Sequence, residues 1–169
     1  MKNLLVVCRT NSTTSLMAES LINERGGGDW RAFSAGSEPA ISANAYTLAL
    51  IKEAGFAGRG VLRPKNWRDF EGPNAPRFDT IVTVSEDVVW EDMPIWNGVP
   101  RLLHWALPDP LAHVCSPIER MAMFRALFDL VEAKVEAFLD EETRAMRVRP
   151  QANDNLNDSR ADRAFRFGT

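Results

Sequence analysis

One stretch near the start of the sequence indicates the fold most clearly: Asn3-Leu4-Leu5-Val6-Val7-Cys8-Arg9-Thr10-Asn11-Ser12-Thr13-Thr14-Ser15, followed by Leu16-Met17-Ala18-Glu19. Its apolar run, residues 4–7, predicts a fully buried strand. A short polar loop follows Cys8, and a helical pattern begins directly after the loop. Strand, tight loop and helix N-terminus in this order favour an anion site, because loop and first-turn N–H groups converge with the positive end of the helix dipole.

Cys8 stands at the tip of the predicted strand, and two interpretations of it are open. Inside the field of the loop and helix, its thiolate would be stabilised and its pKa lowered, as a nucleophile requires. Free cysteine is also among the most buried residue types and packs as a small hydrophobe at strand ends. The stretch by itself does not decide between a nucleophile and a core residue.

The composition is that of an ordinary globular chain. The 169 residues are 45% hydrophobic and 25% charged, and fit one domain. No apolar run approaches the length of a membrane span, and no signal peptide is apparent, so we expect a cytoplasmic protein. The two cysteines and two histidines have no metal-ligand spacing, and nothing indicates a cofactor or a membrane partner.

Charge is distributed unevenly along the chain. The net charge of −3 combines a body of −6 with a tail, residues 144–169, that holds six arginines and three aspartates. Neither block is dense enough to indicate nucleic-acid binding. We therefore expect a domain over residues 1–143 and a disordered or locally helical tail over 144–169. The tail is a candidate contact for a protein partner.

Strand and helix patterns alternate along the body. Strands are predicted at residues 4–7, 30–34, 78–84 and 102–105. Helices are predicted after the first loop as far as Gly26, from Ser42 or Asn44 to Ala54, briefly at 67–70 and 85–90, and from Pro117, capped by Ser116, to about Thr143. The last helix has an apolar stripe: Met121, Phe124, Phe128, Val131, Val135 and Phe138.

This alternation predicts an α/β fold, a four-stranded parallel sheet flanked by helices in three layers. Ligands of such sheets bind beyond the carboxyl ends of the strands. Cys8, Ser85 and Asp109 all fall at such ends, which places a thiol, a hydroxyl and a carboxylate at one edge of the sheet.

In these features the sequence resembles the low molecular weight protein tyrosine phosphatases and the related thioredoxin-coupled bacterial arsenate reductases. Their loop, Cys-x-x-Asn-x-x-Arg-Ser before a Met-Ala-Glu helix, is matched at Cys8, Asn11, Ser15, Met17, Ala18 and Glu19. Further matches are Phe33-Ser34-Ala35-Gly36-Ser37, several residues between Trp67 and Val84, and His104-Trp105-Ala106-Leu107-Pro108-Asp109-Pro110, the last resembling the reductases. The resemblance covers about residues 3–140.

The resemblance implies a role for each matched site residue. Cys8 would be the nucleophile, Ser15 the hydroxyl partner of its thiolate, Asn11 the brace of the loop and Asp109 the general acid. These assignments agree with the chemistry, because a thiolate needs donors around it and an oxygen leaving group needs an acid within hydrogen-bond reach. The expected oxyanion ligand is phosphate or arsenate, bound weakly by residues of the loop: Arg9, Thr10, Asn11, Ser12, Thr13, Thr14 and Ser15.

The loop departs from the family pattern where the chemistry is most demanding. Thr14 stands in place of the arginine, and a hydroxyl cannot reproduce the charged, bidentate clamp of a guanidinium. Cys8 also loses its main counter-charge and should be less ionised. Arg9 leaves the loop in another direction, and we expect it at the surface or paired with a carboxylate. Thr10 replaces a glycine of the family, so either the loop backbone differs or its φ is ordinary.

The cysteine relay of the reductases is also interrupted. Thr13 and Ser85 stand where the resemblance places second cysteines, and neither side chain can form a disulfide. A relay from Cys8 to Cys115 stays open as a minor alternative.

Three functions remain in view. The first is an impaired family member that keeps weak oxyanion binding with a regulatory role. The second is a working phosphatase or arsenate reductase using Cys8 and Asp109. The third is a non-catalytic interaction module that uses the tail. The sequence leaves open whether the protein is an enzyme.

Overall fold

Four parallel strands form one sheet at the centre of the fold. The computed structural model describes residues 1–56, 62–86, 88 and 93–148. Strand β1 (Lys2–Cys8) pairs with β2 (Trp30–Gly36) on one side and with β3 (Thr80–Thr83) on the other. β4 (Arg101–His104) pairs with β3, which gives the order β2-β1-β3-β4. The central β1 is buried from Leu4 onward because its residues pack into both faces of the sheet.

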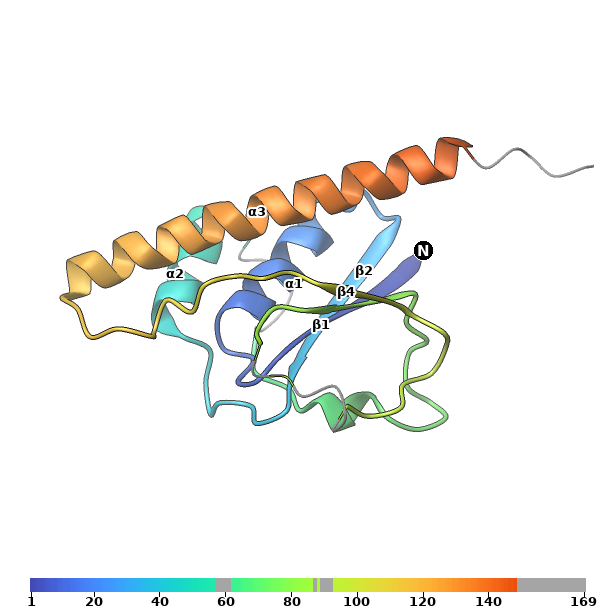
Figure 1. Cartoon of the computed structure of the whole chain (residues 1–169), viewed down its shortest axis with the longest axis horizontal. Coiled ribbons are helices and arrows are strands. Elements are labelled where there is room, and N and C mark those ends of the chain that lie inside the picture. Colours follow the sequence, from blue (N-terminus) through green and yellow to red (C-terminus); the bar gives the residue numbers. More distant parts are fainter. Residues whose placement is uncertain (57–61, 87, 89–92, 149–169) are drawn as a thin grey trace, which may run out of the picture.

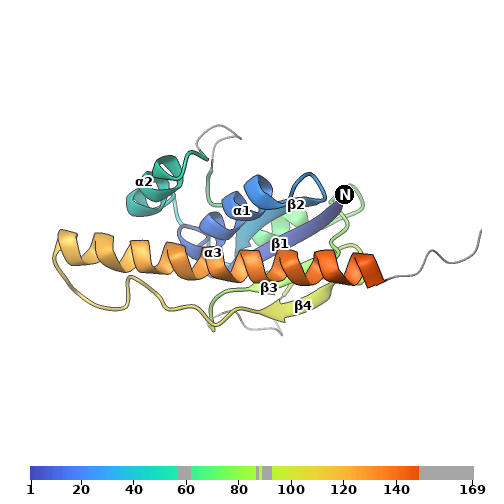
Figure 2. The ribbon, with the colours of Figure 1, turned by 90° about the horizontal axis from the view of Figure 1, so that it is seen from above.

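Three helices cover one face of this sheet (Figures 1 and 2). They are α1 (Thr14–Arg25), α2 (Ala45–Glu53) and α3 (Pro117–Val148). Asn44, rather than Ser42, caps α2, because its side-chain oxygen accepts a hydrogen bond from the N–H of Tyr46 at 2.9 Å. The core under the helices joins alternate residues of β1 to the apolar sides of the helices: Leu4, Val6, Cys8, Met17, Leu21, Ile22, Phe124, Leu127, Val131 and Val135.

The opposite face is covered by the short 3-10 helix η1 (Trp67–Phe70) and by loops. The other alternate residues of β1, Leu5 and Val7, pack there among aromatic side chains: Trp67, Phe70, Phe78 and Trp96. Trp96 donates its indole N–H to the carbonyl of Trp67 at 3.1 Å, which ties the loop before β4 to η1. The predicted three-layer α/β fold is therefore confirmed, although among the described residues the second outer layer is made of η1 and loops.

The last helix follows the predicted stripe. Phe124, Phe128, Val131, Val135 and Phe138 are buried, and the ring of Phe138 lies against Trp30 and Trp105. Ser116 caps the helix as expected: its Oγ accepts from the N–H of Glu119, whose carboxylate accepts from the N–H of Ser116. The Ser116 hydroxyl also donates to the Glu119 carboxylate at 2.7 Å, and this bond, together with the one from the N–H of Ser116, lowers the pKa of Glu119.

The observed strands begin or end one or two residues away from the predicted ones, and two predicted helices differ by more. α3 continues beyond the expected boundary at 143 to Val148, because Glu142 is buried and receives both Lys2 Nζ at 2.6 Å and Arg101 Nη1 at 3.3 Å. The rest of the predicted tail, 149–169, lies outside the described residues. The brief helix expected at 85–90 lies partly outside them as well, and Ser85, Glu86 and Val88 are not helical.

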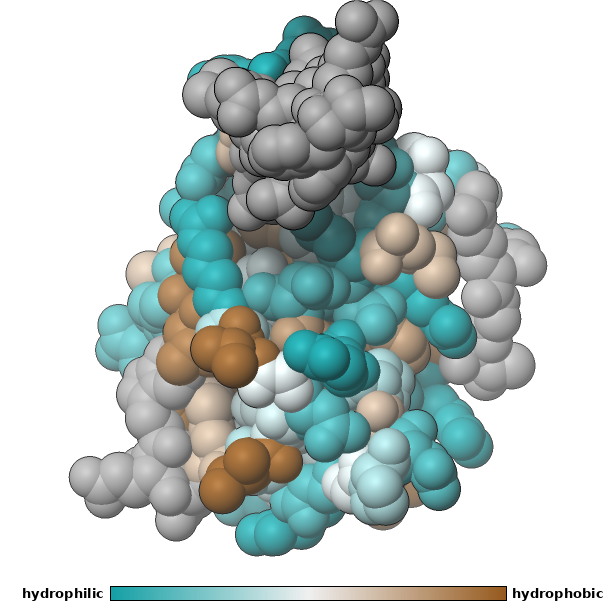
Figure 3. Space-filling model, turned by 90° about the vertical axis from the view of Figure 1, so that its right-hand side faces the viewer, coloured by the Kyte–Doolittle hydropathy of each residue, from teal (hydrophilic) through white to brown (hydrophobic). Residues whose placement is uncertain are grey.

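The end of the molecule that holds the amino terminus of β1 has a mixed surface. In Figure 3, brown apolar side chains form small separate groups among teal hydrophilic ones. Within the described ranges, the structure has no helix with the length and apolarity that a membrane span requires.

Candidate functional site

Cys8 lies at the carboxyl end of β1, directly before the loop 9–13 and the first turn of α1. Like those of any helix, the N–H groups of Thr14, Ser15 and Leu16 have no partner within α1. Together with the helix dipole they create positive potential at the end of the strand. The sequence therefore places the thiol where an anion site was predicted.

The carbonyl groups of the loop are occupied by the segment that follows β2. The carbonyls of Cys8 and Arg9 accept from Ser37 and Glu38 at 3.2 and 2.9 Å, and those of Thr10 and Ser12 accept from Ala40 and Asn44 at 2.8 and 2.9 Å. The loop carbonyls thus point toward residues 37–44, while loop N–H groups converge on the sulfur of Cys8. Such a concave set of N–H groups suits an anion.

Gly36 makes this close approach possible. A Cβ at this position would lie 2.4 Å from the carbonyl oxygen of Arg9 and 3.0 Å from the nitrogen of Asn11. Both neighbours are backbone atoms of the loop, so they cannot move aside as a side chain would. The glycine at the end of β2 therefore lets the loop pack directly against the sheet.

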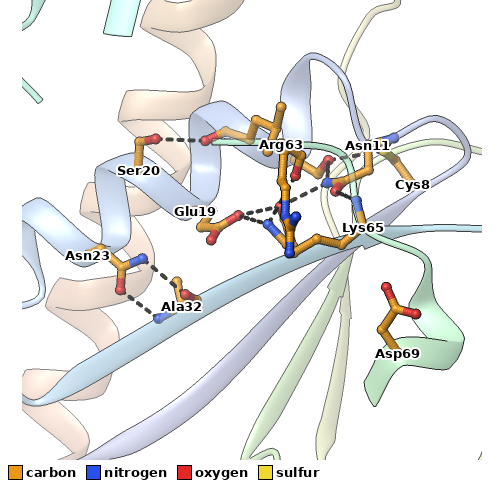
Figure 4. Close-up of polar contacts among 12 residues, drawn as sticks. Cys8, Asn11, Glu19, Ser20, Asn23, Ala32, Arg63, Lys65 and Asp69 are labelled. Carbon is orange, nitrogen blue, oxygen red and sulfur yellow. Dashed lines mark hydrogen bonds and ion pairs between the residues drawn. The ribbon is translucent and has the colours of Figure 1, made fainter. Parts of the chain in front are cut away.

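Asn11 braces the loop from inside (Figure 4). It is fully buried and has a φ of 47°, a left-handed conformation that asparagine tolerates better than most residues. Its side-chain nitrogen donates to Ser15 Oγ and to Ser34 Oγ, both at 2.8 Å, and its side-chain oxygen accepts from the N–H of Lys65 at 2.8 Å. The bond from Lys65 fixes the orientation of the amide.

The brace ends on the sulfur of Cys8. Ser15 Oγ lies 3.1 Å from Cys8 Sγ, and the N–H of Asn11 donates to the same sulfur at 3.1 Å. Because Ser15 Oγ already accepts from Asn11, its own hydroxyl hydrogen is free to donate to the sulfur. Ser15 is therefore placed as the hydroxyl partner that the resemblance implied.

A partly buried ion pair supports the brace from behind. Lys65 Nζ lies 2.9 Å from Glu19 Oε2, and the same carboxylate accepts from Ser34 Oγ (Figure 4). The two side chains are 21% and 15% exposed. Lys65 is thus connected to Asn11 in two ways. Its backbone N–H bonds to Asn11 directly, and its ammonium group holds Glu19, which bonds to Ser34, which in turn bonds to Asn11.

The protonation of Cys8 differs from the first expectation for this loop. Burial raises the pKa of the Cys8 thiol, and the hydrogen bonds from Ser15 and from loop N–H groups, which act in the opposite direction, do not compensate for it. The expectation of a lowered pKa was therefore wrong for this loop. A raised pKa does agree with the other expectation, that Cys8 is less ionised because the loop has no arginine.

A cavity of about 360 Å³ opens over the thiol. Leu107, Pro108, Asp109 and Leu111 form its far wall, so the Asp-Pro loop faces the cysteine as the resemblance implied. Asp109 is exposed, and its carboxylate accepts from the N–H of Leu111 at 2.9 Å. A neighbouring cavity of about 410 Å³ shares Ser85 and Asp109 with the first one.

The loop residues predicted to bind an anion do not all reach this cavity. Cys8, Arg9, Thr10, Thr13 and Thr14 line it. Asn11, Ser12 and Ser15 lie outside its lining, and Ser12 Oγ is 3.1 Å from Thr10 Oγ1. Among the described residues other than glycine, Asn11 alone has a positive φ, so Thr10 has an ordinary φ.

Arg9 is paired with a carboxylate, as expected. Its Nε and Nη2 atoms both donate to Glu38 Oε2, at 3.1 and 2.9 Å. Both side chains are more than half exposed, so this pair is screened by water and salt. Arg9 is thus held by Glu38, which also lines the cavity.

The two residues at the relay positions share an unusual feature. Thr13 Oγ1 and Ser85 Oγ are shielded from solvent and have no hydrogen-bond partner among the described residues. Both side chains line the cavity. Cys115 is not part of that lining, and its sulfur lies 3.9 Å from Met123 Sδ. The geometry thus gives no support to a relay from Cys8 to Cys115.

We predict that Thr13→Val raises the free energy of unfolding by about 1 kcal/mol, because an unsatisfied buried hydroxyl costs about 1–3 kcal/mol and valine keeps its shape. Urea denaturation measures this change. Thr83→Val is the matched control, since Thr83 Oγ1 is bonded to His104 Nδ1 at 2.7 Å and its loss should be destabilising. Equal destabilisation by both substitutions would contradict the account.

Several residues of the site carry no motif that reveals their role. The bonds from residues 37–44 to the loop carbonyls and from Lys65 to Asn11 are donated by backbone N–H groups, and Glu38, the partner of Arg9, lies 29 residues away in the sequence. For Glu19 the Met-Ala-Glu match was a signal, but its partners Ser34 and Lys65 come from two other segments of the chain.

Known proteins of one family resemble this chain over most of its length. The family model described as low molecular weight phosphotyrosine protein phosphatase matches residues 3–149. An arsenate reductase of Bacillus licheniformis is 24% identical over 140 residues, which cover 82% of this chain and 96% of the relative.

Two solved structures have the same fold. The arsenate reductase of Archaeoglobus fulgidus aligns with a TM-score of 0.63 at 24% identity, covering 81% of this chain and 98% of that one. An arsenate reductase in the phosphate binding state aligns with a TM-score of 0.59 at 21% identity, covering 83% and 98%. With the family match over nearly all the described residues, these likenesses lead to one conclusion: the chain belongs to the low molecular weight phosphotyrosine protein phosphatase family.

Proposed function

We propose that this protein binds phosphate or a similar oxyanion at the loop 9–13 without turning it over by cysteine chemistry. One of the related structures is an arsenate reductase in the phosphate binding state. The concave loop and the first turn of α1 support the same ligand class here, because their N–H groups converge beside the cavity. A binding role of this kind is suited to sensing or regulation.

The observation that carries the proposal is that the described part of the chain provides no unpaired guanidinium at the loop. Position 14 holds a threonine at the start of α1, and Arg9, the one cation among the described residues that line the cavity, is paired with Glu38. Loss of a single well-placed hydrogen-bond donor to a transition state costs about 10²–10³ in rate. A charged, bidentate donor is worth at least as much.

The state of the nucleophile supports the same conclusion. A thiolate, not a thiol, attacks phosphorus or arsenic. Burial raises the pKa of Cys8, so the thiol form prevails near neutral pH. Asp109 lines the cavity across from the loop, but a general acid assists the departure of a leaving group and cannot replace the nucleophile that displaces it.

We predict that iodoacetamide alkylates Cys8 slowly near neutral pH and that the rate is still rising with pH above pH 9, because the reactive thiolate is a minor species until the pH passes the raised pKa. Mass spectrometry of Cys8 and of Cys115, as an internal comparison in the same chain, gives both rates. Fast alkylation of Cys8 near neutral pH would overturn this part of the proposal.

The same shift predicts the direction of a stability change. Above the pKa of an unfolded cysteine, the unfolded chain releases the thiol proton while the native protein retains it. The contribution of Cys8 to stability is therefore present below about pH 9 and is lost as the pH rises further. Cys8→Ser should remove most of this dependence in urea titrations.

Two assays on the full chain test the proposal. Inorganic phosphate should raise the melting temperature, and neither an aryl phosphate nor arsenate with thioredoxin should be turned over by the wild type above the level of Cys8→Ser. Turnover that Cys8→Ser abolishes would establish the second function, a working phosphatase or reductase. Absence of both turnover and stabilisation by phosphate would favour an interaction module.

A further inference from the structure

The charges around the cavity limit which oxyanion it can hold. Among the described residues, its lining contains the carboxylates of Glu38 and Asp109 and a single cation, Arg9, which is paired with Glu38. Glu86, beside Ser85 and Asp109 in the neighbouring cavity, adds another acidic group. The ion pair of Lys65 and Glu19 behind the loop is neutral as a whole. The charged side chains that line the cavity therefore sum to a negative charge.

The groups that face a bound ligand include acceptors as well as donors. N–H groups of the loop and of the first turn of α1 donate, and the carboxylates of Asp109 and Glu38 can only accept. Thr13 is 8% exposed, lines the cavity, and has a hydroxyl without a partner among the described residues, so this hydroxyl can accept or donate. A ligand that satisfies this mixture must itself carry a proton to donate.

We propose that the cavity selects the singly charged, protonated form of a tetrahedral oxyacid, such as dihydrogen phosphate or its arsenate analogue, over dianions, both sulfate, which has no proton, and hydrogen phosphate, which keeps one proton but carries two charges. This inference rests on the proposed function, since it specifies the ligand of the same loop. The bare oxygens of the ligand accept from the loop N–H groups. A hydroxyl of the ligand donates to a carboxylate of the cavity, most directly to Asp109 across from the loop.

Sulfate is the discriminating comparison. It has the size and shape of phosphate, but near neutral pH it carries two charges and no proton. Against the carboxylates of Asp109 and Glu38 it meets repulsion, because it has no proton to donate to them. Because Asp109 and Glu38 are exposed and screened by water, we expect discrimination of about tenfold rather than several thousandfold.

The pH dependence of binding then comes from the ligand. Cys8 stays protonated in this range because burial raises its pKa, and His104 and His113, the two histidines of the chain, are not part of the cavity lining. Phosphate loses its second proton near neutral pH, which leaves a dianion with a single hydroxyl to donate and a second negative charge facing the carboxylates of the cavity. Its affinity should therefore fall about tenfold between about pH 6 and about pH 8, opposite to the trend of a cationic site that prefers the dianion.

Calorimetric titration of the full chain with inorganic phosphate and with sulfate, at equal ionic strength and at both pH values, tests this inference. We expect phosphate to bind at least ten times more tightly than sulfate at the lower pH and to weaken as the pH rises. Asp109→Asn should bring the two anions within about threefold. Asp140→Asn, which removes an exposed carboxylate from α3, is the matched control. It should leave the affinities for phosphate and for sulfate unchanged.

The outcomes separate the two proposals. Phosphate that binds as tightly at the higher pH, or sulfate that binds as well as phosphate, would overturn the selectivity while leaving oxyanion binding intact. Selectivity that persists in Asp109→Asn would overturn the role of this carboxylate. If phosphate binds at neither pH, the proposed function itself fails, and the selectivity fails with it.

Discussion

Thr14→Arg should raise the rate of aryl phosphate hydrolysis at least 10²-fold, the lower end of about 10²–10³ for a single well-placed transition-state donor. Position 14 opens α1 and lines the cavity that contains Cys8 and Asp109. A guanidinium there would offer two parallel charged hydrogen bonds to the oxygens of the transferring group. It would also lower the pKa of the Cys8 thiol and so oppose the effect of burial. Steady-state kinetics at neutral pH measures the gain.

Two further variants show where such activity comes from. Thr14→Lys supplies the charge without the planar fork, and it should recover much less of the rate. The double variant Thr14→Arg with Cys8→Ser should return to the level of the wild type. Thr14→Arg could bind phosphate more tightly and still gain no turnover. That result would show that the loss of the arginine is not the only defect of the catalytic site.

Asn11→Ala should lower the free energy of unfolding by about 3–5 kcal/mol, because it removes three hydrogen bonds and each buried partner left unsatisfied costs about 1–3 kcal/mol. The three partners are Ser15, Ser34 and the N–H of Lys65. All belong to the contact between loop, sheet and the segment before η1. Urea denaturation followed by far-UV circular dichroism measures the loss.

Two comparisons separate the brace from other effects. Asn11→Gly loses the same hydrogen bonds but accepts the φ of 47° without strain, so the difference between Gly and Ala reports the backbone. Asn44→Ala removes an asparagine that makes one capping bond to α2 and should cost about 1 kcal/mol. Equal losses for Asn11→Ala and Asn44→Ala would show that the loop is not held by this network.

Local patterns predicted most of the fold. The apolar run of β1, the stripe of α3 and the cap at Ser116 depend on neighbouring residues, and each is found where the sequence places it. The end of α3 was missed because its last turns are polar. Glu142 is held by Lys2 and Arg101, which are remote in the chain, so periodicity could not reveal that contact.

The site was predictable in its positions but not in its electrostatics. Cys8 and Asp109 line one cavity, and Ser15 and Asn11 lie within hydrogen-bond distance of the Cys8 sulfur, while the roles that the resemblance implies for these residues stay predictions. The direction of the Cys8 pKa depends on burial against several hydrogen bonds, and no sequence pattern gives that balance. The pairing of Arg9 with Glu38 likewise requires the close approach of residues 37–44 to the loop.

We propose that this loop holds an oxyanion but does not perform cysteine chemistry on it. The most direct measurement is the hydrolysis of an aryl phosphate by the wild type and by Cys8→Ser at neutral pH, prepared and assayed side by side. We expect the wild type and Cys8→Ser to show equal rates, both at the level of the uncatalysed reaction. Wild-type turnover that disappears in Cys8→Ser would contradict it.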